Sequence, residues 1–138
     1  MSRNINTVLA KNVSTRANDR CEYCGISISD TYFGGEIDHI LSIKHGGETT
    51  FENLALACQP CNRKKGTDLG SVLADSRKLI RFFDPRTDVW SEHFTINSNA
   101  EIETLSDIGK VTADIFGFND PERIDERIGL IEIGHYKT

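Results

Sequence analysis

The sequence predicts a small α+β fold with an N-terminal helix, a short cross-linked core, and a C-terminal β-hairpin followed by helices. Three observations predict it: apolar residues at helical spacing near the N-terminus, two CxxC pairs that bracket a strand-forming segment, and a turn-separated pair of strands after Pro85. At 138 residues the chain has room for one modest core with an appendage. We expect a core domain over residues 1–81 and an extension packed on it over residues 82–138.

Up to Cys58, the chain reads as one helix followed by two or three strands. Apolar residues near helical spacing predict a helix over residues 5–17, and a loose alternation allows a short strand over 26–33. Strands are predicted at 36–40 and, after a loop marked by Gly46–Gly47, at 54–58, although this second apolar run could also be a turn of helix.

The second half opens on an ambiguous segment. Pro60 and Gly66 predict a short helix over 59–65, whereas residues 67–83 fit either a helix or an extended segment. The EHFTI and EIETL segments then predict a β-hairpin, and Ser106, Gly117 and Pro121 delimit two helices, over 106–116 and from 121 to about 131. Trp90, Phe94, Ile96, Ile102 and Leu105 are expected to be core residues; the alternative is a surface for a protein partner.

Charge is distributed unevenly along the chain. The net charge of -5 argues mildly against a nucleic-acid partner. Residues 58–81, however, carry six basic and two acidic side chains, while residues 82–138 carry five basic and twelve acidic ones. A local basic patch can therefore still face phosphates, and the acidic final third is not expected to lie along DNA.

Four cysteines form two widely separated pairs. Cys21 and Cys24 make one CxxC, and Cys58 and Cys61 make the other. No apolar run has the length of a signal peptide or a membrane span, so we expect a cytoplasmic protein without disulfides. Four thiolates from two tight knuckles make the closed tetrahedral shell of structural zinc, so the pairs predict a zinc site rather than free or redox-active thiols.

The segment between the cysteine pairs resembles the HNH endonuclease family. That family's ββα-metal motif, also called the His-Me finger, has two antiparallel strands and a helix that hold one divalent ion. The matching residues are Asp38 and His39 at the end of the first strand, Asn53 in the loop, and Asn62 on the helix. The Gly46–Gly47 pair and the CxxCNRKKG ending also look like the zinc-containing branch. The match covers about residues 21–66.

The chemistry that these residues offer is hydrolysis of a phosphodiester bond. The Asp38 carboxylate and the Asn62 amide oxygen are hard ligands suited to catalytic Mg²⁺ or Mn²⁺. His39, with an ordinary pKa near ~6.5, can accept a proton from water as the general base. The resemblance implies that Asn53 ties the loop down and helps to orient the imidazole. Neighbouring strand residues point to opposite faces, so we expect the strand to twist or end at Asp38 and His39.

Basic residues follow Asn62 directly. Arg63, Lys64 and Lys65 would contact the phosphate backbone without reading its sequence; the alternative is an ordinary solvated face. His45 is expected to be solvated, and His93 and His135 to be structural or on the surface.

The sequence thus predicts a metal-dependent endonuclease, with DNA as substrate and RNA as a second possibility. The alternative is a non-catalytic zinc module that binds nucleic acid or protein. An Asp, His and Asn trio disfavours it, because a binding module has no need of a metal ligand set and a base. The sequence does not determine the oligomeric state.

Overall fold

The computed structural model describes residues 5–136, and the contacts of the chain divide into two units. The first unit ends at Leu69 and the second begins at Gly70. This division lies earlier than the expected boundary between residues 81 and 82. The reason is local: residues 70–81 form a hairpin that packs on a helix of the second unit. The domain boundary itself stays a prediction.

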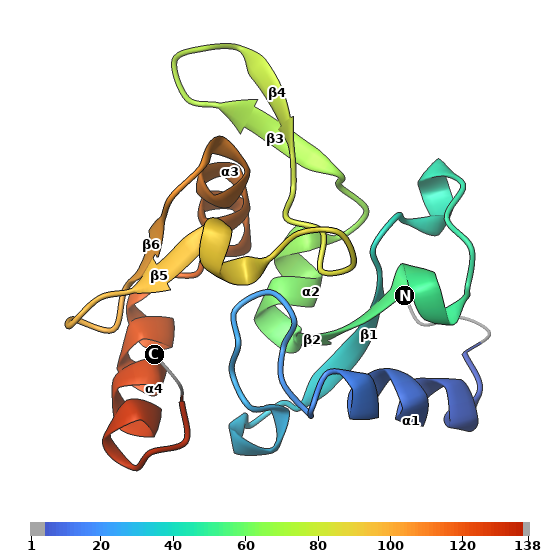
Figure 1. The fold of residues 1–138 in the computed structure, drawn as a ribbon, viewed down its shortest axis with the longest axis horizontal. Helices are drawn as coiled ribbons and strands as arrows, with labels where there is room; N and C mark the ends of the chain where they lie inside the picture. Colours follow the sequence, from blue (N-terminus) through green and yellow to red (C-terminus); the bar gives the residue numbers. More distant parts are fainter. Residues whose placement is uncertain (1–4, 137–138) are drawn as a thin grey trace. The chain divides into compact units, whose positions relative to one another are not determined.

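The first unit is built around one antiparallel strand pair with a helix on each side (Figure 1). Helix α1 spans Thr7–Arg16 and begins at Asn6, whose side chain accepts a hydrogen bond from the Leu9 N–H at 2.8 Å. Strands β1 (Gly35–His39) and β2 (Leu54–Cys58) follow, and helix α2 spans Gln59–Lys65. These elements confirm the predicted mixed α+β fold.

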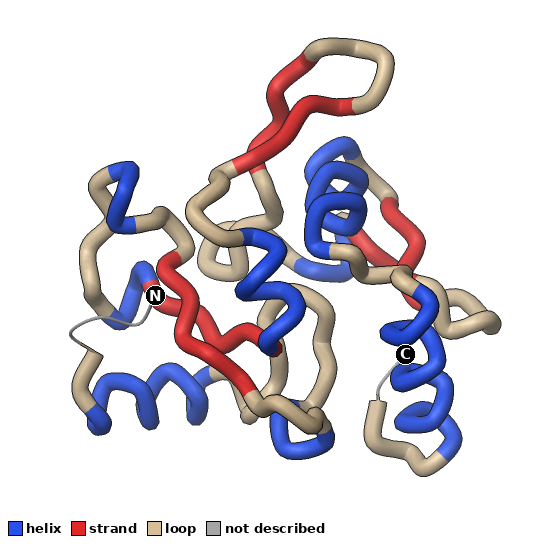
Figure 2. The backbone as a smooth tube through the Cα atoms, turned by 180° about the vertical axis from the view of Figure 1, so that it is seen from behind, coloured by secondary structure: helices blue, strands red, loops and turns tan. Residues whose placement is uncertain are grey.

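Strand β2 is buried along its whole length because helices cover both of its faces. Leu54 and Leu56 pack with Val13 of α1 in the core of the unit. The alternate residues Ala55 and Ala57 point to the other face, where α2 packs on both strands. Seen from behind, the strand pair lies between α1 and α2 (Figure 2). The small alanine side chains allow α2 to approach the strands closely.

Strand β1 ends at His39, as expected from the functional residues Asp38 and His39 being neighbours. Asp38 pairs with Ala55 and His39 with Leu54, and the chain bends at Ile40. The short strand that the sequence allowed over residues 26–33 does not form. Ser27 makes only an isolated bridge to Arg20, and Ile28–Asp30 form a 3₁₀ turn instead. Two more 3₁₀ turns, Ile43–His45 and Phe51–Asn53, occupy the loop between β1 and β2.

The second unit contains two hairpins and two helices. The ambiguous segment after residue 67 is extended: β3 (Gly70–Leu73) pairs antiparallel with β4 (Lys78–Arg81), and both contact α3. Strands β5 (Phe94–Ile96) and β6 (Ile102–Thr104) form the predicted hairpin. Helices α3 (Asp107–Phe116) and α4 (Pro121–Glu132) follow at nearly the predicted bounds, with Ser106 as N-cap and Gly117 as a left-handed C-cap of α3.

Aromatic side chains make the core of the second unit. Phe94 packs against Phe83 and Phe118, with ring centroids 5.6 and 5.4 Å apart, and Ile102 is equally buried. Of the five expected core residues, Phe94 and Ile102 are buried and Trp90 and Ile96 are half-buried. The expectation for Leu105 is wrong, since this residue is 57% exposed just after β6. His93 donates to or accepts from the Ser106 hydroxyl at 2.6 Å, a structural role that agrees with expectation.

Two buried arginines hold the end of this unit together. Arg127 of α4 donates to the Ala100 and Phe118 carbonyls, each at 2.7 Å. Arg123 donates to the Phe116 carbonyl at the end of α3. These guanidinium groups satisfy carbonyls that a helix end or a turn leaves without an intrahelical partner.

Candidate functional site

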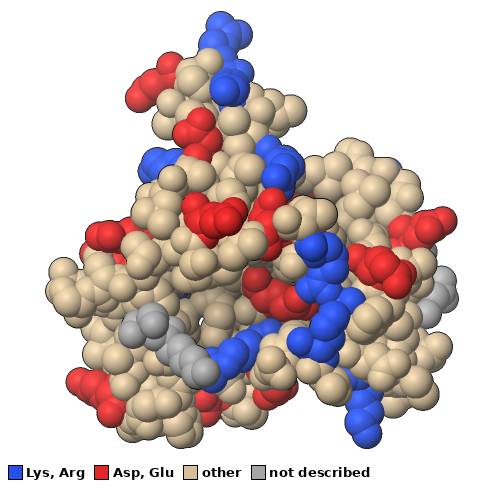
Figure 3. Space-filling model, in the orientation of Figure 1, with Lys and Arg blue, Asp and Glu red and all other residues tan. Residues whose placement is uncertain are grey.

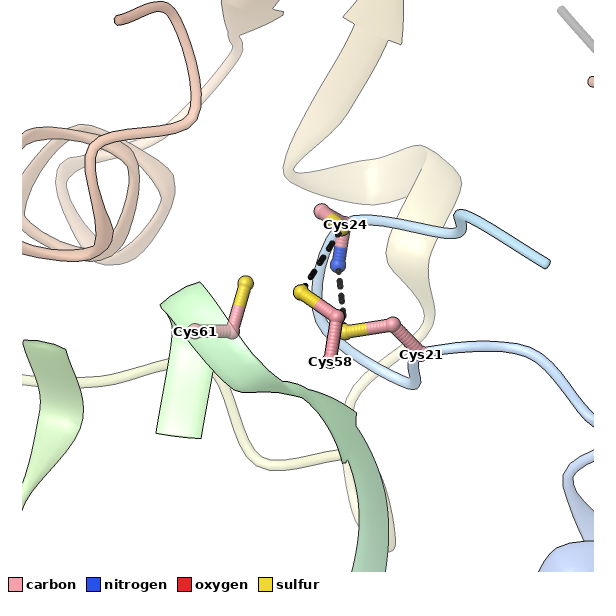
Figure 4. A group of neighbouring side chains, drawn as sticks. All are labelled: Cys21, Cys24, Cys58 and Cys61. Atoms are coloured by element: carbon pink, nitrogen blue, oxygen red, sulfur yellow. Dashed lines mark hydrogen bonds between the residues drawn. The ribbon is translucent and has the colours of Figure 1, made fainter. Parts of the chain in front are cut away.

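The four cysteines converge in the first unit, as the sequence predicted. Cys21 and Cys24 lie on the loop after α1, Cys58 ends β2, and Cys61 lies in the first turn of α2 (Figure 4). All four are buried, and their Sγ atoms lie within 4.8 Å of one another. The sequence spacing therefore corresponds to one cluster rather than to two separate pairs.

The cluster fits a tetrahedral zinc ion. Zinc–sulfur bonds of about 2.3 Å place neighbouring sulfurs of a tetrahedron about 3.8 Å apart, and the Sγ atoms of Cys24 and Cys58 are 3.7 Å apart. The Cys24 N–H points at Cys21 Sγ at 3.4 Å, which closes the knuckle. Burial raises the pKa of the Cys61 thiol, so the free cluster favours protonated thiols and metal binding has to release protons. This cluster supports a structural zinc site.

A buried carboxylate contacts both the first CxxC knuckle and α2. Asp38, only 3% exposed, accepts a hydrogen bond at Oδ2 from the Tyr23 hydroxyl at 2.6 Å. Its Oδ1 lies 3.4 Å from Asn62 Nδ2. Burial raises the pKa of the Asp38 carboxyl, and the Lys65 ammonium and the Tyr23 hydroxyl oppose that shift. The structure thus brings together Asp38 and Asn62, the pair expected to hold a divalent ion.

Lys65 is buried and does not lie on the exposed face where phosphate contacts were expected. The side chain is 2% exposed, and its Nζ lies 3.3 Å from the Asp38 carboxylate. The same ammonium donates to the main-chain carbonyls of His39 at 2.9 Å and Ile40 at 3.2 Å. Lys65 points inward because α2 presents this position to the end of β1, where a buried carboxylate needs a cation.

The imidazole of His39 is held by a residue of the following loop. His39 Nε2 lies 2.9 Å from the Thr49 hydroxyl. Burial lowers the pKa of His39, the neighbouring Asp38 carboxylate raises it, and the Lys65 ammonium lowers it. The ring is therefore neutral at pH 7, and its nitrogen without a hydrogen can accept a proton.

Asn53 acts on this loop rather than on the imidazole. Its side chain accepts from the Leu41 N–H and donates to the Leu41 and Glu48 carbonyls, each at 2.9 Å. Gly47 completes the clamp, because a Cβ there would lie 1.7 Å from the Leu41 oxygen. Asn53 thereby places Glu48, and with it the adjoining Thr49, next to the ring of His39.

Asp38 and His39 line one cavity although they are neighbours on a strand. The cavity has a volume of about 240 Å³, and its other lining residues are Ser42, Ile43, Lys44, Gly66 and Thr67. The strand ends at His39 and the chain bends at once, so both residues border the same space. Ser42 fixes one wall by donating its hydroxyl to the Thr67 carbonyl at 3.1 Å.

Arg63 and Lys64 are exposed, unlike Lys65. Arg63 makes an ion pair with Glu36 at 3.2 Å, and its side chain is 66% exposed. Basic and acidic side chains are interspersed over the face seen in Figure 3, including the β3–β4 hairpin at the top of that view. Of the basic segment, Arg63 and Lys64 of α2 are thus exposed at the surface of the first unit.

Three partners of the site were not identified from the sequence: Tyr23, Thr49 and, in its buried role, Lys65. Only Tyr23 carried a usable signal, since it lies inside a CxxC knuckle whose position the zinc cluster fixes. The other two depend on contacts between residues that are far apart in the chain.

Comparison with known proteins supports the resemblance seen in the sequence. Residues 21–68 match the family model described as HNH endonuclease. No curated protein and no solved structure gives a significant match. Among residues 5–136, no helix combines the length and the apolar character needed to cross a membrane. The matched segment holds the cysteine cluster, both strands β1 and β2, and helix α2. Residues 21–68, about a third of the chain, are therefore similar to the HNH endonuclease family model.

Proposed function

We propose that the protein is a metal-dependent endonuclease that hydrolyses phosphodiester bonds in DNA. The observation that carries the proposal is the meeting of Asp38 and His39 on one cavity, with Asn62 Nδ2 3.4 Å from the Asp38 carboxylate. The HNH endonuclease match over residues 21–68 supports a nuclease in general terms.

His39 is the general base in this proposal. The imidazole takes a proton from a water molecule, and the resulting hydroxide attacks phosphorus while the bond to the leaving oxygen breaks. His39 Nε2 carries the hydrogen when it donates a hydrogen bond to the Thr49 hydroxyl oxygen. In that tautomer Nδ1 carries no hydrogen, so Nδ1 is the nitrogen that receives the proton from water. Asn53 contributes by fixing the loop that carries Thr49.

Asp38 and Asn62 are the proposed ligands of a divalent ion. Bound there, Mg²⁺ or Mn²⁺ would neutralise the charge that develops on the phosphoryl and leaving oxygens. The donor set fits in its chemistry, because a carboxylate has lone pairs left after three hydrogen bonds. Asn62 has to turn its amide over, since Nδ2 now faces Asp38 and only Oδ1 can bind a cation.

The exposed residues Arg63 and Lys64 are the proposed contacts to the phosphate backbone. They follow Asn62 on α2, so a strand bound at the cavity passes close to them. Such contacts give affinity that falls with salt and do not select a sequence. The same chemistry serves RNA, and direct competition between the two nucleic acids decides the preference.

The test is plasmid nicking at low salt with Mg²⁺ or Mn²⁺, comparing the native protein with His39→Ala and His45→Ala. His45 lies in the same loop and is exposed, so it controls for the substitution itself. We expect nicking by the native protein and by His45→Ala, and a loss of about 100-fold or more in His39→Ala. Zinc content must be equal in all three.

The other outcomes discriminate between the alternatives. If none of the three proteins cuts while all bind DNA, the proposal is wrong and the non-catalytic zinc module replaces it. Equal cutting by native protein and His39→Ala would assign the activity to a different base or to a contaminant.

A further inference from the structure

Tyr23 connects the cysteine cluster to the proposed ion site. It lies between Cys21 and Cys24, and it is completely buried. Its hydroxyl donates to Asp38 Oδ2 at 2.6 Å, a length typical of a hydroxyl bonded to an ionised carboxylate. A buried phenol and a buried carboxylate each need such a partner.

The knuckle that carries Tyr23 is fixed at several points. The Gly25 N–H donates to the Cys21 carbonyl at 2.9 Å, which closes the turn. Glu22 pairs with Leu56 of β2 twice, through its own N–H and through its carboxylate, each at 2.8 Å. Since β2 pairs with β1, the knuckle that carries Tyr23 is attached to the same strand pair as Asp38.

The two oxygens of Asp38 have different surroundings. Oδ2 takes the hydrogen bond of Tyr23, whereas Oδ1 faces Asn62 Nδ2 at 3.4 Å. The Lys65 ammonium lies 3.3 Å from both oxygens and does not distinguish them. The phenol is therefore the group that fixes which oxygen faces Asn62.

We propose that Tyr23 is a positioning residue for the catalytic ion: its hydroxyl pins Oδ2 of Asp38 so that Oδ1 is presented beside Asn62. The zinc knuckle thus orients a ligand of the second metal. This inference rests on the proposed function, because it needs a divalent ion at Asp38. Hydrogen bonds to a ligating carboxylate typically change metal affinity by about 10–100-fold when they are removed.

The experiment compares Mn²⁺ binding by the native protein, Tyr23→Phe and Tyr32→Phe, measured by electron paramagnetic resonance with zinc already bound. Tyr23→Phe removes one hydroxyl and keeps the ring. Tyr32→Phe is the same change at a side chain that is 90% exposed. We expect Tyr23→Phe to weaken Mn²⁺ binding by about 10-fold or more with unchanged zinc content, and Tyr32→Phe to bind as the native protein does.

A third substitution shows whether Tyr23 acts through Asp38. We expect Asp38→Asn alone to weaken Mn²⁺ binding strongly, and Tyr23→Phe to add little in that background, because residues that act through one group are not additive. Additive losses would overturn the proposed route.

Two further outcomes separate this inference from the proposed function. Equal Mn²⁺ affinity in the native protein and Tyr23→Phe overturns the inference and leaves the nuclease proposal standing. Absence of Mn²⁺ binding that depends on Asp38 in the native protein overturns both.

Discussion

The ammonium of Lys65 meets one carboxylate and two main-chain carbonyls at the point where β1 ends. Its distances to the His39 and Ile40 carbonyls are 2.9 and 3.2 Å, and both Lys65 and Asp38 are almost completely buried. A buried carboxylate without a cation is costly, and a strand end leaves carbonyls that need donors. One lysine meets both needs, so it supports the geometry of Asp38 and His39 together.

Lys65→Met should destabilise the zinc-loaded protein by about 3–5 kcal/mol, because it removes the charge that compensates buried Asp38. Urea unfolding followed by circular dichroism measures the change. Lys64→Met is the matched control, since Lys64 is exposed at the preceding position of the same helix. We expect it to change the free energy of unfolding by no more than about 0.5 kcal/mol. A similar small effect of both substitutions would contradict this role of Lys65.

At the scale of the element, the β3–β4 hairpin is fastened to the turn that follows it. Arg81 at the end of β4 donates two hydrogen bonds to Asp88, at 2.7 and 3.0 Å, and the Asp84 N–H donates a third at 2.8 Å. The Arg81 hydrogen bonds lower the pKa of Asp88, although partial burial acts in the opposite direction. The pair stabilises the fold while Asp88 is ionised.

Asp88→Asn should therefore cost stability in a manner that depends on pH. The folded pKa of Asp88 lies below its unfolded value of about 3.9, so the contribution is complete above that pH and is lost as pH falls through the folded pKa. We expect the difference in unfolding free energy between native protein and Asp88→Asn to be largest at pH 7 and to shrink below about pH 4.

The single tryptophan, Trp90, lies in the second unit and reports the unfolding by fluorescence. Asp114→Asn is the control, because Asp114 pairs with Lys110 on the surface of α3 and such exposed pairs contribute little. A difference for Asp88→Asn that stays constant between pH 7 and pH 3 would show that the ion pair is not its cause.

At the scale of the whole molecule, the two units depend on different forces. All four cysteines belong to the first unit, in which Val13, Leu54 and Leu56 form a small hydrophobic cluster. The second unit has its own aromatic core around Phe94. Structural zinc contributes about 10–16 kcal/mol in small domains, which is comparable to the whole stability of a domain.

Removal of zinc with a strong chelator under reducing conditions should therefore unfold the first unit and leave the second one folded. Amide spectra by nuclear magnetic resonance would follow each unit: signals from residues up to 69 should collapse, and those from residue 70 onward should persist. Added zinc should restore the lost signals. If all signals collapse together, the two units form one cooperative structure instead.

Much of this arrangement follows from the sequence because local spacing determines local geometry. The CxxC pairs gave the cluster of Cys21, Cys24, Cys58 and Cys61. Pro60 and Gly66 delimited α2, and Ser106 and Gly117 delimited α3, since caps act on the backbone next to them. Strand β1 ended at His39, as expected because Asp38 and His39 are neighbours that have to border the same site.

Only the tertiary structure decided which way the polar side chains of the core point. A lysine forms helix equally well on a solvated or a buried face, so nothing local distinguished buried Lys65 from exposed Lys64. The contacts of Asp38 with Tyr23 and Lys65, like that of His39 with Thr49, join residues separated by ten or more positions. Such contacts exist only once the strands and α2 have packed, and they determine how the residues named by the motif are held.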